Sequence, residues 1–406
     1  MMQGIDYVSG RRFGLDWLRI GAFGLLILYH IGMFFVPWGW HVQTAEPSQW
    51  VAIPMLALSP WRLALLFLIS GVASSALLSR MTGPGGFARE RSIRLLIPLS
   101  AGMALFVAPQ AWVELREKAG YIEGFRYFWV NDYFEFGASR GLILPTYNHL
   151  WFVAYLWLYT MILAALVTVP RTFRTRAQRW FNQLFAGWRL IALPVLWLFA
   201  GRMLLYPVFK ETHALVDDLY AHSLYGFAFF FGVGVARSQL IWEAIVARWK
   251  PAAIMALVAY LGFAASYVLY DMIPVAGAAP GWALLLSRLA RSIQAWCAIV
   301  ALLGVAQLYL HRDGPVRRYL TEAIFPYYIA HQTIIVLVGY MVKPHGLGSA
   351  AELAILLLAT LVGCGLAYEI PKRIPLARPL FGLKPNTPSQ GFRGLAPFAR
   401  NIARAA

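Results

Sequence analysis

Long apolar stretches, each separated from the next by a short polar segment, dominate the pattern of the 406-residue chain. A helix that crosses a bilayer needs about 20 consecutive, mainly apolar residues, and about ten stretches meet or approach that length. They lie near residues 15–37, 52–79, 92–110, 149–169, 189–206, 222–240, 252–270, 284–310, 323–342 and 350–370. The pattern predicts an all-α fold, a polytopic transmembrane helical bundle with about ten spans.

The composition agrees with a chain that is embedded in a membrane. Hydrophobic residues make up 60% of the sequence and charged residues only 13%, whereas soluble domains carry about 25% charged residues. The apolar stretches leave no soluble domain of useful size. We therefore expect one integral membrane domain over residues 1–384 and a basic cytoplasmic tail over 385–406, in a multi-pass protein of the cytoplasmic (inner) membrane.

The net charge of +17 is explained by where the basic residues lie. With both termini placed in the cytoplasm, the inner loops and tails hold 25 of the 35 Lys and Arg residues, and the outer segments hold 10. This is the positive-inside distribution of membrane proteins, and it predicts an even number of spans with both termini cytoplasmic. The expected surrounding is therefore a lipid bilayer, and the basic surplus does not indicate nucleic-acid binding.

An arginine and a histidine stand eleven residues apart in the first apolar stretch, DWLRIGAFGLLILYHIGMFFV. Eleven residues at about 100° each come to roughly three full turns, so Arg19 and His30 share one helix face, about 16 Å apart along the axis. Ionisable groups at membrane depth are costly and usually face a protein interior or a wet cavity. The pair indicates a functional site; an interfacial Arg and a His bonded to a neighbouring helix remain the alternative.

The third stretch opens with ARERSIRLLIPL, in which Arg91 and Arg94 share one helix face where the chain enters the membrane. Two guanidinium groups on one face form a fork that suits a phosphate or a carboxylate. Taken alone, the same two residues are also typical of ordinary positive-inside anchors.

Five further polar residues are candidates to line a cavity together with the first histidine. His331 is a second histidine at membrane depth, in TEAIFPYYIAHQ, and a purely structural role for it is at least as common. The same stretch holds Tyr328 and Glu322. His149 stands at an outer boundary of the fourth stretch, and Ser70 precedes a glycine that suits close helix packing.

Metal chemistry finds little support in the sequence. Within a span, no pair of His, Asp or Glu residues stands at the i, i+3 or i, i+4 spacing that places two ligands on one helix face. The two cysteines, Cys297 and Cys364, lie inside predicted spans without a CxxC spacing. We expect both cysteines to be buried and no metal to be bound.

Together, these segments resemble the membrane acyltransferase-3 family over nearly the whole chain. The first stretch carries the family's basic-x10-His motif as Arg19 and His30, preceded by Asp16. FLISGVASSALL looks like the family's second span, and RSIRLLIP supplies its R-x-x-R motif as Arg91 and Arg94. The segments HLWFVAYL, FPYYIAHQ and RPLFGLK are similar to the branch that contains the periplasmic glucan succinyltransferase.

The resemblance implies a membrane O-acyltransferase that moves an acyl group, of the acetyl or succinyl class, from cytoplasmic acyl-coenzyme A to a hydroxyl of an extracytoplasmic carbohydrate or glycan. It implies His30 as the general base, Arg19 and Asp16 as further residues of the catalytic motif, and Arg91 and Arg94 as ligands of the co-substrate. Elementary chemistry agrees, because coenzyme A is a polyanion and an imidazole is well matched to removing a hydroxyl proton near neutral pH. Transient acylation of His30 and direct transfer both stay open.

Two other functions fit parts of the same pattern. A proton-coupled transporter or flippase would use His30 and His331 as a proton relay, but it would also need intramembrane carboxylates, which the central spans almost lack. A structural or sensory protein would use the basic residues to bind anionic lipid. None of these motifs fixes the acceptor, the acyl chain or the oligomeric state.

Overall fold

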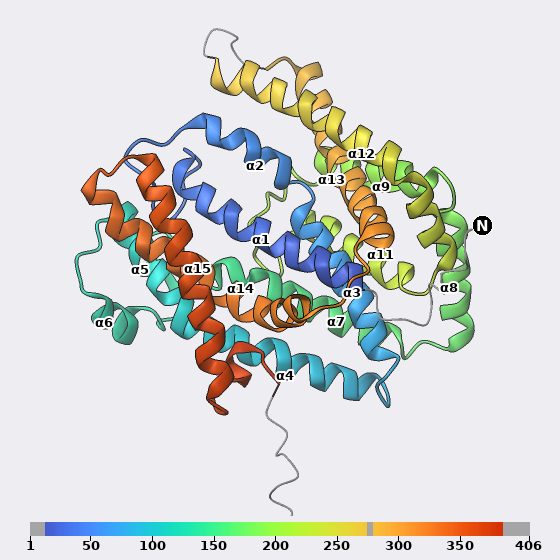
Figure 1. Ribbon diagram of the computed structural model, residues 1–406, viewed down its shortest axis with the longest axis horizontal. Coiled ribbons are helices and arrows are strands. Elements are labelled where there is room, and N and C mark those ends of the chain that lie inside the picture. The colour runs from blue at the N-terminus through green and yellow to red at the C-terminus, as the bar shows by residue number, and fades with distance from the viewer. Residues whose placement is uncertain (1–12, 274–278, 385–406) are drawn as a thin grey trace, which may run out of the picture.

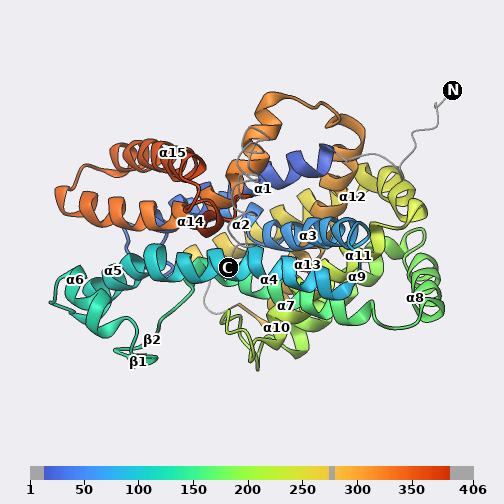
Figure 2. The same cartoon turned by 90° about the horizontal axis from the view of Figure 1, so that it is seen from below.

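The computed structural model describes residues 13–273 and 279–384, and the predicted tail at 385–406 lies outside the described residues. The described chain is a bundle of helices (Figure 1) with one small two-stranded hairpin (Figure 2). Apart from that hairpin, the all-α prediction is confirmed.

The helices and strands have the following bounds. They are α1 (Phe13–Phe35), α2 (Ala52–Leu58), α3 (Arg62–Leu78), α4 (Pro84–Gly102), α5 (Ala108–Ala119), α6 (Phe125–Tyr127), β1 (Gly137–Ser139), β2 (Leu142–Leu144), α7 (Trp151–Leu166), α8 (Arg171–Leu184), α9 (Arg189–Leu204), α10 (Leu219–Ala221), α11 (Phe227–Val235), α12 (Gln239–Tyr267), α13 (Gly281–Tyr309), α14 (Pro315–Val342) and α15 (Ser349–Arg373). Short π-helical turns join or extend several of them, at Met103–Val107, Phe128–Asp132, His222–Gly226 and Val268–Met272.

Within the described residues, eight helical segments are long and apolar enough to cross a membrane. They coincide with eight of the predicted stretches, so the chain is a multi-pass membrane protein. The other two predicted spans, 189–206 and 222–240, form shorter apolar helices, namely α9 with 16 residues and the run Leu219–Val235. α9 meets α8 at a bend of 97°, and the two helices reach spanning length only when they are counted as one broken span.

The helix α8, which follows the fourth span, was not predicted from the sequence. Its four arginines alternate with apolar side chains, of which Phe173, Trp180 and Leu184 are exposed. A search for continuous apolar runs misses such a helix because only one of its faces is apolar. An exposed amphipathic helix with a basic face is typical of helices that lie in the membrane interface.

α1 runs through the centre of the bundle and packs against α3, α13 and α14, while α12 lies along α13 and α14 along α15 (Figures 1 and 2). Glycines permit the closest crossing. A Cβ atom on Gly71 of α3 would lie 2.0 Å from the carbonyl oxygen of Phe229, and one on Gly232 of α11 would lie 2.1 Å from that of Leu68. Small residues let helix backbones approach in this way, and the close packing expected after Ser70 is confirmed.

The aromatic-rich segment between the third and fourth spans folds onto the bundle. Tyr121, Phe128 and Tyr133 are buried together, and the hydroxyl of Tyr133 donates to the carbonyl oxygen of Met103 at 2.8 Å. Other aromatic side chains of the segment, such as Phe136, are exposed. Part of this aromatic content is therefore a small hydrophobic core of its own, which covers one side of the third span.

Candidate active site

Two histidines that are 301 residues apart in the sequence meet inside the bundle. His30 comes from the C-terminal half of α1 and His331 from the middle of α14, and Nδ1 of His30 lies 2.8 Å from Nε2 of His331. Their rings are stacked, with centroids 5.0 Å apart and planes 23° from parallel. His331 is fully buried. On its other side the ring of His30 stacks on Trp40, with centroids 6.3 Å apart.

The backbone around His331 fixes which nitrogens carry hydrogen. Nδ1 of His331 lies 2.8 Å from the carbonyl oxygen of Tyr328 and 3.2 Å from that of Tyr327. A carbonyl oxygen can only accept, so Nδ1 of a neutral His331 carries the hydrogen and Nε2 carries the lone pair. Nδ1–H of His30 must then be the donor to His331. Nε2 of His30 is left as the basic nitrogen, and no described residue forms a hydrogen bond with it.

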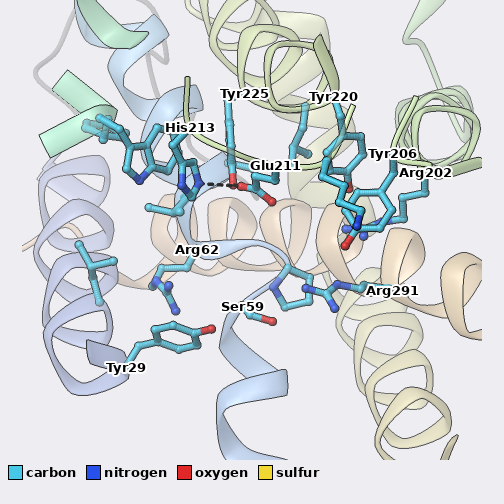
Figure 3. Close-up of a pocket in the computed structure, with 18 of the residues that line it drawn as sticks. Tyr29, Ser59, Arg62, Arg202, Tyr206, Glu211, His213, Tyr220, Tyr225 and Arg291 are labelled. Atoms are coloured by element: carbon cyan, nitrogen blue, oxygen red, sulfur yellow. Dashed lines mark hydrogen bonds and ion pairs between the residues drawn. The ribbon is translucent and has the colours of Figure 1, made fainter. Parts of the chain in front are cut away.

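His30 lines a cavity of about 610 Å³. Figure 3 shows other residues of the same lining, among them the neighbouring Tyr29. Most of the lining comes from helix ends. The C-terminal parts of α1, α9 and α12 contribute, together with the N-terminal parts of α3, α7 and α13 and the segment that precedes α10. Because these parts line one cavity, they lie together at one end of the bundle, which we call the cavity end. The cavity therefore reaches the histidine pair from that end.

Two more of the predicted site residues, His149 and Tyr328, line the same cavity. Nε2–H of His149 donates to the carbonyl oxygens of Tyr328 and Ile329, each at 3.1 Å, and the hydroxyl of Tyr328 donates back to the carbonyl oxygen of His149. This reciprocal pair of contacts ties the start of α7 to α14. The ring of His149 also stands edge-on to His331, with centroids 5.2 Å apart.

Two candidates for the cavity lie elsewhere, and His331 stands behind His30 rather than in the lining. Glu322 forms an ion pair with Arg378 at 3.6 Å, near the beginning of α14. Ser70 is adjacent to the glycine crossing between α3 and α11. Neither Glu322 nor Ser70 lines the cavity, because a position in an apolar stretch does not reveal which face or depth a side chain occupies.

The first-span motif residues lie toward the opposite end of the bundle, where α1 begins. Arg19 donates from Nη2 to the carbonyl oxygen of Thr321 at 3.3 Å. Asp16 forms an ion pair with the buried Arg317 at 2.5 Å, and Arg317 also binds Asp313 at 2.7 Å. Hydrogen bonds from Arg318 and Arg317 hold the pKa of the Asp313 carboxyl well below its ordinary value. Asp16 thus joins α1 to α14, roughly 20 Å along the helix from His30.

Arg91 lies in the first half of α4 and Arg94 just past its midpoint, and α4 also begins at the opposite end. Arg94 is partly exposed and contacts Glu90 at 3.9 Å, a spacing of one helical turn. Neither arginine lines the cavity beside His30. The structure therefore separates the predicted donor-binding arginines from the histidine pair.

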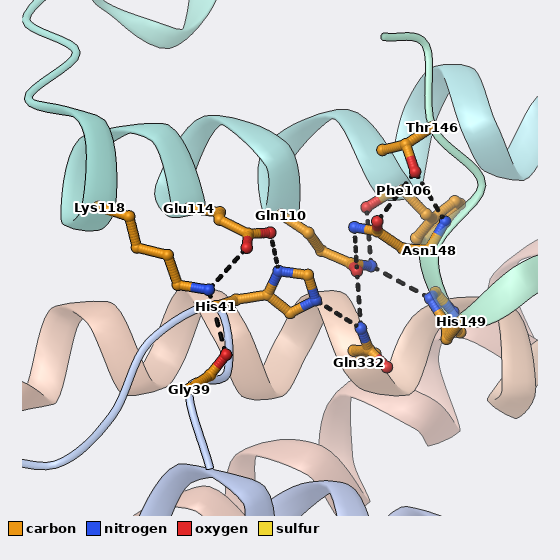
Figure 4. A network of polar contacts seen from close by, with 10 residues as sticks. All are labelled: Gly39, His41, Phe106, Gln110, Glu114, Lys118, Thr146, Asn148, His149 and Gln332. Carbon is orange, nitrogen blue, oxygen red and sulfur yellow. Dashed lines mark hydrogen bonds and ion pairs between the residues drawn. The ribbon is translucent and has the colours of Figure 1, made fainter. Parts of the chain in front are cut away.

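A chain of polar contacts that the sequence analysis missed leads to the histidines from α5 (Figure 4). Nδ1 of His41 lies 2.5 Å from a carboxylate oxygen of Glu114, and Gln332 bonds to Nε2 of His41 at 3.0 Å. Gln332 also donates to Gln110 at 3.0 Å, and Gln110 lies 3.4 Å from Nδ1 of His149. Its members come from four segments that are far apart in the sequence, so no local motif could have revealed it.

The charge of the cavity was not predicted from the sequence either. Five cationic side chains line it, and Glu211 is the one carboxylate among the lining residues. The cations are Arg62, Arg202, Lys210, Arg288 and Arg291. A signal was present, because all five belong to the small set of basic residues that the positive-inside pattern places on the outer side. Among the described residues, no group of three or more His, Cys, Asp or Glu side chains is arranged to hold a metal ion.

Comparison with known proteins identifies the family. The model of the family described as "Acyltransferase domain" (acyltransferase 3) matches residues 12–369. Glucans biosynthesis protein C of Salmonella gallinarum is 22% identical over 389 residues, and that of Escherichia coli O6:K15:H31 is 23% identical over 385 residues. Each alignment covers 92% of this chain and 95% of the relative. No solved structure matches the chain significantly. The resemblance seen in the motifs is confirmed: the chain belongs to the membrane acyltransferase-3 family and is an acyltransferase.

Proposed function

We propose that the protein is a membrane O-acyltransferase that transfers an acyl group from cytoplasmic acyl-coenzyme A to a hydroxyl of an extracytoplasmic glycan, with His30 as the general base. The observation that carries the proposal is the histidine pair. Nδ1–H of His30 is held by His331, which leaves Nε2 as a basic nitrogen on a ring that lines the cavity. The relatives named as glucans biosynthesis proteins support a glycan as the acceptor.

The reaction that this arrangement supports needs one mobile proton. The acceptor hydroxyl oxygen attacks the thioester carbonyl carbon while Nε2 of His30 takes the hydroxyl proton. The carbon–sulfur bond breaks, and the protonated His30 returns that proton to the departing thiolate. A charge-assisted hydrogen bond to His331 stabilises the imidazolium of His30 while it holds the proton. General-base assistance of this kind is typically worth about 10²–10⁴-fold in rate.

The placement of the arginines supports entry of the donor from the end of the bundle opposite the cavity. Arg19 lies about 16 Å from His30 along α1, a distance suited to the extended pantetheine arm of coenzyme A. Arg91 and Arg94 share one face of α4 near the same end, where they would bind the donor's phosphates. Asp16 would contribute through its ion pair with Arg317, which fixes the start of α1.

The distribution of basic residues supports one orientation in the membrane. The 25-to-10 division of Lys and Arg favours both termini and the α4 arginines on the cytoplasmic side of the inner membrane, with the cavity end outside. An even number of spans is then required, and the ten predicted spans meet this if α9 and the run Leu219–Val235 each cross the bilayer. In this orientation the thioester and the acceptor reach His30 from opposite sides.

Reconstitution in liposomes tests the proposal. The parent protein is inserted with its cytoplasmic face outward, radiolabelled acyl-coenzyme A is added outside, and a glucan is enclosed. We expect an alkali-labile ester on the enclosed glucan. Coenzyme A or glucan that crosses the membrane without ester formation would contradict the enzymatic proposal. Transfer that needs both substrates on one side would contradict the proposed direction.

A further inference from the structure

The cations of the cavity are concentrated beyond what membrane topology requires. The outer segments hold 10 of the 35 Lys and Arg residues, and half of those ten line this one cavity. They come from α3, α9, α13 and the segment before α10. The positive-inside pattern disfavours cations at this end, so topology alone does not account for this convergence.

Aromatic rings, rather than carboxylates, hold three of these arginines. The guanidinium carbon of Arg62 lies 3.9 Å from the ring centre of Tyr29, that of Arg202 lies 5.9 Å from Tyr220, and that of Arg291 lies 5.3 Å from Phe263. A cation–π contact holds the group in place but leaves its N–H donors unused.

Several N–H donors of these arginines have no hydrogen-bond partner within the described part of the chain. Arg62 is only 3% exposed, yet its Nε and Nη1 have no hydrogen-bond partner there, and the same is true of Nε of Arg202 and of Arg291. None of the five cations forms an ion pair with a carboxylate of the described residues. A buried N–H donor without an acceptor is costly, and an anionic ligand would supply the missing acceptors.

The one carboxylate of the lining is already occupied. Glu211 accepts hydrogen bonds from the hydroxyl of Tyr225 at 2.5 Å and from Nε2 of His213 at 3.2 Å (Figure 3). Burial acts to raise the pKa of Glu211, but the hydrogen bonds from His213 and Tyr225 outweigh it, and the pKa lies below its ordinary value. Glu211 is therefore ionised at neutral pH. With neutral histidines the lining carries a net charge of +4.

The cationic cluster adjoins the reacting group. Arg62 lies on the ring of Tyr29, which neighbours His30 in α1, and both Arg62 and His30 line the cavity. Arg62 is also the first residue of the 17-residue helix α3, whose N-terminus directs a positive partial charge toward the same space. An anion bound there would lie beside the substrate atoms that meet at His30.

We propose that this cavity is a subsite for an anionic group, a carboxylate or a phosphate, on one of the substrates that react at His30. The proposal rests on the proposed acyltransferase function. It assigns Arg62, Arg202 and Arg291 as specificity-determining residues. Two sources supply the same chemistry: the distal carboxylate of a dicarboxylic acyl chain, or a charged substituent on the glycan. The phosphates of coenzyme A are not the assigned ligand, because the proposed orientation brings them to the opposite end.

Paired substrates distinguish the two sources. In the donor arm, the purified full-length protein transfers from succinyl- or acetyl-coenzyme A to a neutral linear glucan. In the acceptor arm, acetyl-coenzyme A is the donor, and the acceptor is the neutral glucan or its carboxymethylated or phosphorylated form. Each arm gives a ratio of kcat/KM for the charged over the neutral substrate. A binding arm titrates succinate and inorganic phosphate into the protein without turnover.

The variants are Arg62→Gln, Arg202→Gln and Arg291→Gln, with Arg62→Lys as the charge-preserving change. Three separate sites guard against one variant that fails to fold. Arg189→Gln is the matched control, because Arg189 is exposed on the same helix as Arg202 but at its other end. Loss of a hydrogen bond to a charged group corresponds to roughly a tenfold to hundredfold change. We expect each Gln variant to lower one ratio by about that factor, Arg62→Lys to lower it less, and Arg189→Gln to leave both ratios unchanged.

The outcomes separate the two proposals. A fall in the donor ratio assigns the acyl carboxylate, and a fall in the acceptor ratio assigns the glycan substituent. If the parent is active and the folded variants leave both ratios unchanged, the subsite is overturned and the acyltransferase function is not. The same conclusion follows if the three Gln variants lose affinity equally for free coenzyme A, whose phosphates are assigned to the opposite end. A parent that forms no ester, yet binds succinate or phosphate at least tenfold more tightly than these variants, overturns the acyltransferase function and leaves the anion site standing.

Discussion

The contact between His30 and His331 makes a quantitative prediction about a residue that touches no substrate. His331 accepts the N–H of His30 at 2.8 Å and is itself held by the backbone. A hydrogen bond between neutral groups contributes about 0.5–1.5 kcal/mol, and one to a charged group about 1.5–3 kcal/mol. When His30 takes up a proton, the bond to His331 therefore strengthens by about 1–1.5 kcal/mol. At 1.36 kcal/mol per tenfold, this is worth roughly five- to thirteenfold in rate.

Two substitutions separate this positioning role from a structural one. In His331→Gln the amide oxygen replaces Nε2 as the acceptor, and we expect kcat within about threefold of the parent. In His331→Phe the ring volume remains but the acceptor is lost, and kcat should fall about tenfold with KM nearly unchanged. Transfer of a radiolabelled acyl group to glucan measures both. His311→Gln, a change at an exposed histidine at the end of α13, is the control.

Thermal unfolding in detergent shows whether each variant is folded, because His331 is fully buried. A folded His331→Phe protein with parental kcat would refute the reasoning, since the acceptor would then be dispensable. A His331→Gln protein as inactive as His331→Phe would also refute it, because restoring the acceptor would have no effect.

Three further predictions follow from the opposite end of the bundle and from the topology. Arg91→Ala or Arg94→Ala should weaken binding of acyl-coenzyme A by about 1.5–3 kcal/mol, measured by calorimetry, and Lys at either position should restore little of it at a bidentate site. If both alanine variants bind acyl-coenzyme A with the parental affinity, the two arginines only anchor the helix at the membrane surface. Asp16→Asn should lower the stability of the protein by about 1–3 kcal/mol, because it removes one of two carboxylates bound to the buried Arg317; an unchanged melting temperature would contradict this. Single cysteines introduced at positions 130, 215 and 346 should react with a membrane-impermeant reagent added outside. Cysteines at 175, 245 and 315 should react only when the reagent is inside. Labelling of position 130 from inside would overturn the topology.

Much of the fold was predictable because bilayer thickness sets the length of apolar helices. The stretches around α1, α12, α13 and α15, among others, were located from hydropathy alone. The two weakest spans involve features that hydropathy does not describe, namely the 97° bend between α8 and α9 and the short run Leu219–Val235. α8 was missed because its apolar residues are interleaved with arginines.

The site was only partly predictable, for a related reason. His30 and His331 stood out because an imidazole at membrane depth is rare in an apolar run, but their direct contact depends on how α1 packs against α14. Glu322 satisfied the same criterion and instead pairs with Arg378. The cavity cations lie on three different helices and one connecting segment, and their convergence exists only after the helices assemble.

The central claim, that His30 is the general base, is tested most directly by the rate of acyl transfer in His30→Ala and His30→Gln. Both variants remove the proton acceptor, and Gln keeps a polar side chain in its place. We expect both to lose about 10²–10⁴-fold in transfer while they fold, insert and still bind acyl-coenzyme A, because the donor's charge is held elsewhere. A folded His30→Ala protein that retains more than about a tenth of the parental rate would contradict the assignment, because loss of a general base should lower the rate at least about a hundredfold.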